Sequence, residues 1–78
     1  MQNELELLAQ SGPEWIQSHA EMAQAIVEQY HAGGMEQEEM MDILVRMCDS
    51  LDTIPEARKD LDTKSLFITT LYAEAGII

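Results

Sequence analysis

The stretch from Glu14 to His31 lies between two glycine-containing breaks, and its pattern leaves little room for anything but a helix. Ser11-Gly12-Pro13 interrupts the chain, and proline suits a first helical position, where its missing N–H costs nothing. Gly33-Gly34 ends the stretch, because glycine readily adopts a left-handed C-cap. At about 100° per residue, one apolar stripe forms, made of Trp15, His19, Met22, Ile26 and Tyr30 and bordered by Ile16, Ala23 and Val27. The sequence therefore predicts an amphipathic helix at 13–31 with one buried face.

The following segment, 36–50, has more apolar surface than one neighbouring helix can cover. Three glutamates in its first turn favour a helix, because they face the positive end of the helix dipole. The apolar residues are Met40, Met41, Ile43, Leu44, Val45, Met47, Cys48 and Leu51. On a helical wheel they span roughly 200°, against about 100° for a single core-facing stripe. This helix is therefore either the centre of the bundle or in contact with another molecule.

Shorter helices are expected on either side of this pair. Thr53-Ile54-Pro55-Glu56 matches a capping box with proline just inside the start, which predicts a helix at 55–61. Because Lys64 would interrupt the apolar stripe of one continuous helix, we expect a break near Asp62-Thr63. Asp62 would then cap a last helix at 64–75. We expect that helix to turn Leu66, Phe67, Thr70 and Leu71 inward, and Ile77-Ile78 to fold back as an apolar cap. A short helix is also expected at about 3–10.

The fold class follows from these helices. No segment alternates apolar and polar residues for long, and hairpin-type turn dipeptides are absent. The 78 residues are too few for more than one domain. We therefore predict an all-α fold, with 1–78 forming a single bundle of three to five helices. A domain of this size buries only about 60% of its unfolded surface, so its stability is modest. Association with a second copy (a homodimer) or with another protein is a common remedy.

The charge of the chain is strongly one-sided. The chain has fifteen acidic and four basic residues, for a net charge of −11. The basic residues are Arg46, Arg58, Lys59 and Lys64. This balance argues against direct binding of nucleic acid or of an anionic membrane surface. No basic segment precedes an apolar run at the N-terminus, and no apolar run is long enough to span a membrane. We expect a cytoplasmic protein.

The sequence offers no convincing catalytic or metal site. Glu28-Gln-Tyr-His31 has the E-x-x-H spacing of di-iron helices, but it lies on the polar side and has no second copy. His19 is interpreted as a hydrogen-bonded core histidine, and Cys48, among apolar neighbours, as inert packing. Asp60-Leu-Asp62 resembles the start of a calcium loop but lacks the required glycine and glutamate further on. We therefore expect no enzyme, no cofactor and no metal.

Two surfaces remain as candidates for binding. The first is an edge of the helix at 36–50, formed by Met41, Val45 and Cys48 and flanked by Glu38 and Asp49, which we predict to bind protein. The second is an acidic face that would imitate the phosphates of DNA and block a nucleic-acid-binding enzyme. Its residues are Glu14, Glu21, Glu28, Glu36, Glu39 and Asp42. Along 13–31 its carboxylates are about 10.5 Å apart, sparser than DNA phosphates at about 3.4 Å.

The segment from Tyr30 to Leu44, YHAGGMEQEEMMDIL, has a tyrosine-plus-glycine helix stop followed by a glutamate-rich helix start. It resembles the helix–glycine–helix pattern of small acidic helical accessory proteins of tailed bacteriophages. The resemblance implies an assembly factor, or a factor in the host cytoplasm that binds a host or virion protein. The pattern is architectural, so no functional residue is carried over. We thus expect a non-enzymatic protein-interaction factor, with the acidic DNA mimic as the alternative.

Overall fold

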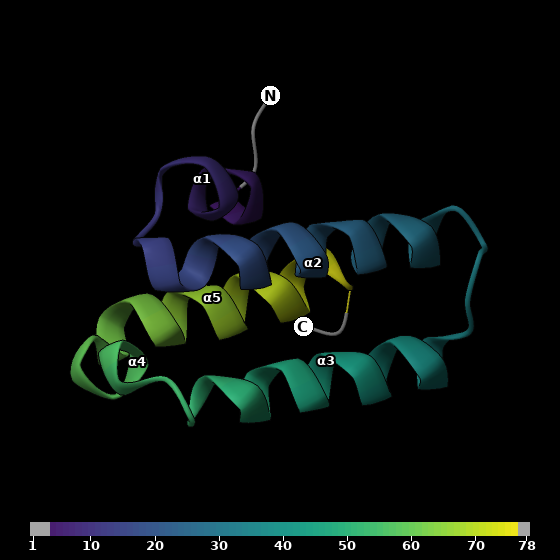
Figure 1. Cartoon of the computed structure of the whole chain (residues 1–78). Helices are drawn as coiled ribbons and strands as arrows, with labels where there is room; N and C mark the ends of the chain where they lie inside the picture. Colours follow the sequence, from purple (N-terminus) through teal and green to yellow (C-terminus); the bar gives the residue numbers. More distant parts are fainter. Residues whose placement is uncertain (1–3, 77–78) are drawn as a thin grey trace.

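Helix α2 (Glu14–His31) lies at the centre of the bundle and packs against three other helices. The computed structural model describes residues 4–76. Figure 1 shows α1 (Glu4–Ser11) across one side of α2, and α3 (Gln37–Leu51) along the other. The remaining two helices, α4 (Pro55–Lys59) and α5 (Leu61–Glu74), complete the bundle, and α5 packs against both α1 and α2. The described residues contain no strand, which confirms the predicted all-α fold.

The buried line of α2 is not the stripe expected from its sequence. Ile16, Ala20, Ala23 and Val27 are buried, whereas most of the expected stripe is only partly buried and Met22 is 57% exposed. The two lines are about a quarter turn apart on the helix. The difference arises because α1 packs against the flank of α2 beside the expected stripe and buries that flank. The expected stripe is therefore the other flank of α2, facing α3.

The connection from α1 to α2 is too tight for any side chain at Gly12. A Cβ atom added there would lie 2.6 Å from the Leu8 carbonyl oxygen and 3.0 Å from Ile16 Cγ2. The first distance is prohibitive, because the backbone oxygen cannot move aside, and the second is tight. The glycine therefore breaks the helix and also lets α1 fold back onto α2.

The boundary between the last two helices differs from the prediction. Asp60, not Asp62, caps α5, because its carboxylate accepts a hydrogen bond from the Thr63 amide at 3.2 Å. The expected capping box of α4 is also wrong: Ile54 is the N-cap residue, and the Thr53 hydroxyl donates to the carbonyl of Ser50. Lys64 does not break the helix, since a lysine stem can lie along apolar surface while its ammonium group reaches a carboxylate.

The inward face of α5 is narrower than expected. Phe67, Thr70 and Leu71 are buried, as predicted, but Leu66 is 43% exposed. Leu66 lies about 100° around the helix from Phe67, so the two cannot both face the core of a narrow bundle. The predicted cap formed by residues 77 and 78 lies outside the described residues.

An ion pair joins the end of α3 to the start of α5. Lys64 Nζ lies 2.6 Å from Asp52 Oδ1, and Arg58 Nε donates to the backbone carbonyl of Asp52 at 2.8 Å. The hydrogen bond from Lys64, followed by its positive charge, lowers the pKa of the Asp52 carboxyl below its usual value. A lowered pKa in the folded state means that the ionised carboxylate stabilises the fold.

This contribution is expected to depend on pH. It is complete above the unfolded-state pKa of aspartate, about 4, and is lost as the pH falls through the lower folded-state value. Asp52→Asn should therefore destabilise the protein at pH 7 more than at pH 3, as measured by urea denaturation. Glu21→Gln, which changes an exposed carboxylate in the middle of α2, is the control. An equal loss at both pH values for Asp52→Asn would contradict the assignment.

Candidate protein-binding surface

Helix α3 leaves an apolar edge uncovered beside its buried line. Met40, Leu44, Met47 and Leu51 are buried against the rest of the bundle. The α3 edge, which we define as Met41, Val45 and Cys48, lies next to them around the helix. Val45 is 43% exposed, and the other two are partly buried. Since α3 lies on the outside of the bundle and packs mainly on α2, no other described helix covers Val45.

A surface depression of about 500 Å³ lies on this side of α3. It is lined by Gln37, Glu38, Met41, Asp42 and Val45. The structure thus brings together three of the five residues of the predicted site: Glu38, Met41 and Val45. The predicted flanking residue Asp49 is exposed one turn beyond Val45, and Cys48 turns toward the bundle. Asp42, which the sequence placed on the alternative acidic face, borders the same depression.

The Cys48 thiol lies next to the Tyr72 side chain of α5. Burial raises the pKa of the Cys48 thiol, and a hydrogen bond with the Tyr72 side chain offsets part of that rise. A thiol with a raised pKa carries little thiolate at neutral pH, and the thiolate is the nucleophilic form. Cys48 therefore serves packing at the inner margin of the α3 edge, in agreement with its interpretation from sequence.

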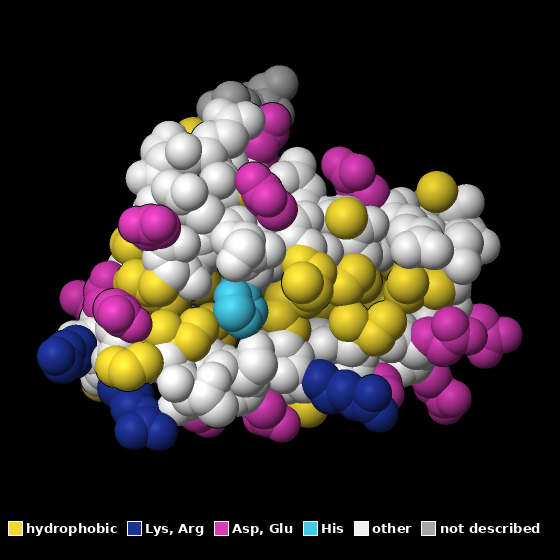
Figure 2. Space-filling view, in the orientation of Figure 1, with side chains coloured by type: hydrophobic (Ala, Val, Ile, Leu, Met, Phe, Trp, Pro, Cys, Tyr) yellow, Lys and Arg dark blue, Asp and Glu magenta, His cyan; other side chains and the backbone are white. Residues whose placement is uncertain are grey.

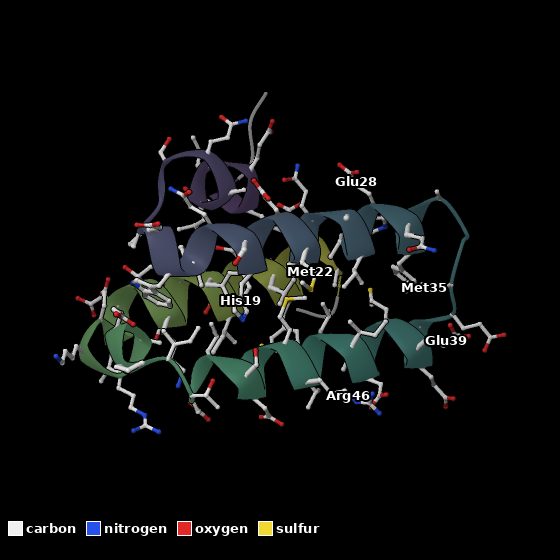
Figure 3. The ribbon with its side chains drawn as sticks, viewed as in Figure 1. His19, Met22, Glu28, Met35, Glu39 and Arg46 are labelled. Carbon is white, nitrogen blue, oxygen red and sulfur yellow. The ribbon has the colours of Figure 1, made fainter. Side chains whose placement is uncertain are left out.

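A second apolar region, not expected from the sequence, follows the seam between α2 and α3. Figure 2 shows hydrophobic side chains in a band along this seam, with a histidine in the middle of the band. Figure 3 places His19 and Met22 on the side of α2 that faces α3, and Met35 lies in the loop that connects the two helices. Helical periodicity assigns His19 and Met22 to a buried stripe, so only the position of α1 could have revealed that Met22 is exposed.

His19 bridges the two helices across this seam. Its Nε2 lies 3.0 Å from Ser50 Oγ, and that hydroxyl donates its own proton to the Met47 carbonyl at 2.7 Å. Ser50 must therefore accept from His19 Nε2–H, which leaves Nδ1 unprotonated when the ring is neutral. The buried Nδ1 has no hydrogen-bond partner. His19 is thus a partly buried structural histidine.

Val45 lies about 140° around α3 from Ser50, so the α3 edge and the seam face different directions.

The residues of the alternative acidic face do not gather on one side. All six are exposed, on α2 and at the start of α3. In Figure 3, Glu28 points away from α3, whereas Glu39 extends from the beginning of α3. Asp42 pairs with Arg46 at 3.0 Å. Figure 2 likewise shows carboxylates around the border of the visible face, with the apolar band between them.

Candidate metal ligands do not gather in the described part of the chain. Residues 4–76 contain no cluster of three or more histidine, cysteine or acidic side chains that could hold a metal ion. Glu28 and His31, which have the di-iron spacing, are both exposed. His31 Nε2 instead donates to the Glu74 carbonyl at 2.7 Å, which ties the ends of α2 and α5 together.

Within residues 4–76, no helix is both long and apolar enough to cross a bilayer.

The environment of Cys48 predicts slow alkylation. In the folded protein at pH 8, iodoacetamide should react with Cys48 about tenfold more slowly than with the same thiol in urea, because both the thiolate fraction and access are reduced. Tyr72→Phe should slow the native reaction further, since it removes the hydrogen bond that lowers the pKa of the thiol. A native rate equal to the rate in urea would contradict this environment.

Comparison with known proteins adds no relative: no protein-family model, no curated protein and no solved structure matches this chain.

Proposed function

We propose that the protein works by binding another protein through the α3 edge, without catalysis. The observation that carries this proposal is the depression of about 500 Å³, in which the side chains of Met41 and Val45 adjoin Glu38 and Asp42. An uncovered apolar strip with a charged border has the anatomy of a protein interface, which has an apolar centre and a polar rim.

The position of α3 supports the same proposal. The buried residues of α3 already pack against the bundle. Val45 instead contributes exposed apolar surface that no described helix covers. Methionine suits such a surface, because its unbranched, polarisable side chain adapts to different partners. Binding would also stabilise a domain whose own core is small, since a ligand that binds only the folded state shifts the equilibrium toward folding.

The role that fits this surface is that of an accessory or assembly factor acting in the cytoplasm. The resemblance to small acidic phage proteins favours a host or virion protein as the partner. An acidic decoy for a nucleic-acid-binding enzyme is the alternative. It is less well supported, because Glu28 and Glu39, two of the six residues proposed for it, extend in different directions.

A pair of substitutions tests the site. Leu44→Ala removes a fully buried side chain and should cost about 2–5 kcal/mol of stability. Val45→Asp should leave the melting temperature nearly unchanged but abolish association, because the new charge would lose its water only in the complex. Met22→Asp places the same charge on the exposed part of the seam and is the matched control.

Melting temperature and capture of protein from a lysate of the source cells are measured for each variant. If Val45→Asp unfolds the protein as badly as Leu44→Ala does, the whole apolar arc of α3 is core and the site is wrong. If Met22→Asp abolishes capture and Val45→Asp does not, binding occurs at the seam.

A further inference from the structure

Three carboxylates follow the α3 edge along the helix. Glu38, Asp42 and Asp49 are all exposed, and at 1.5 Å rise per residue they extend over about 16.5 Å. Around the helix they lie within about 40° of one another, immediately beside Val45. Two of them line the depression. A partner on the α3 edge would therefore contact an apolar stripe with a row of negative charge along one side.

This negative charge is only partly balanced. Arg46 is the single basic residue of α3, and its guanidinium already pairs with Asp42 at 3.0 Å. Both side chains of this pair are exposed. Because α3 has no other basic residue, it offers no positive charge to Glu38 and Asp49 at the two ends of the row. The whole chain adds to this field with its net charge of −11. A positively charged partner is thus attracted at long range, and its charge is also complementary to the carboxylates beside the α3 edge.

A second copy of the chain fits this edge poorly. In a two-fold dimer the same patch lies on both sides of the interface, so both surfaces carry the row of carboxylates, and the two rows face each other when the two α3 helices pack antiparallel. Like charges brought together at an interface oppose association. The charge of the edge therefore favours a different protein over self-association.

We propose that the α3 edge binds a basic amphipathic helix of another protein, an inference that rests on the proposed function. The apolar stripe of such a helix, with residues at i, i+3 or i+4 and i+7, packs over Met41 and Val45. Lysines or arginines beside that stripe reach Glu38 and Asp49. Binding thus uses the apolar strip for affinity and the acidic row for the choice and orientation of the partner.

The probe is a set of three fluorescent peptides, each about 16 residues long and therefore about 24 Å as a helix. The first carries a leucine stripe flanked by lysines. In the second, each lysine is replaced by glutamate, and in the third, each leucine is replaced by serine. Fluorescence anisotropy is measured against the full chain at physiological ionic strength. The leucine–lysine peptide should bind, and the other two should bind at least about tenfold more weakly.

A charge swap on α3 tests the position of the site. Glu38→Lys combined with Asp49→Lys should weaken the leucine–lysine peptide about tenfold and make the leucine–glutamate peptide the better ligand. Glu21→Lys combined with Glu28→Lys changes the net charge equally but on α2. This matched control should keep the original preference for lysine.

Three results would overturn the inference. If the serine–lysine peptide binds as tightly as the leucine–lysine peptide, the protein acts as an acidic decoy and the apolar strip is not used. If both charge swaps have the same effect, the attraction is a general property of the chain. If no peptide binds while capture from lysate still depends on Val45, the proposed function stands and the partner is not a basic helix.

Discussion

The burial of α2 on several sides is the constraint on which the rest of this structure depends. Helix α1 covers one flank and α3 the other, and α5 packs against both α1 and α2. This arrangement requires α1 to fold back sharply, which only a residue without a side chain allows at Gly12. Because α2 occupies the centre, α3 is left on the outside, with an apolar arc that exceeds what the bundle can bury.

The sequence predicted the helices well because the signals that begin and end them are local. The helices at 13–31 and 36–50 match α2 and α3 to within one residue at each end. The failures lie where the local signals leave more than one choice. Asp60 and Asp62 are both plausible caps, and a lysine inside an apolar stripe looks like a break until its amine is seen to reach Asp52. For Lys64 the choice is made by a contact between helices, which no local pattern contains.

The direction in which each helix faces was harder to predict than its position. Periodicity gives the apolar side of a helix, but it cannot say which part of a wide side is covered. For α2 the missing information was the place of α1, and the exposed Met22 is the consequence. For α3 the apolar arc itself showed that one partner helix would not suffice, so the α3 edge could be named from sequence. The depression beside it depends on side-chain placement and could not.

The acidic charge of the chain and its apolar edge are best understood together. An exposed apolar strip on a small domain tends to associate with copies of itself. A row of carboxylates along that strip opposes such pairing, because a symmetric contact would place negative charge on both surfaces of the interface. On our proposal, the same row would also attract a positively charged surface, so one set of residues would both oppose self-pairing and select the partner. Solubility and recognition are therefore not competing explanations for the acidic residues of α3. On α2 the carboxylates of Glu21 and Glu28 are exposed with no apolar strip beside them on their own side of the helix, so the pairing of charge with apolar surface is particular to α3.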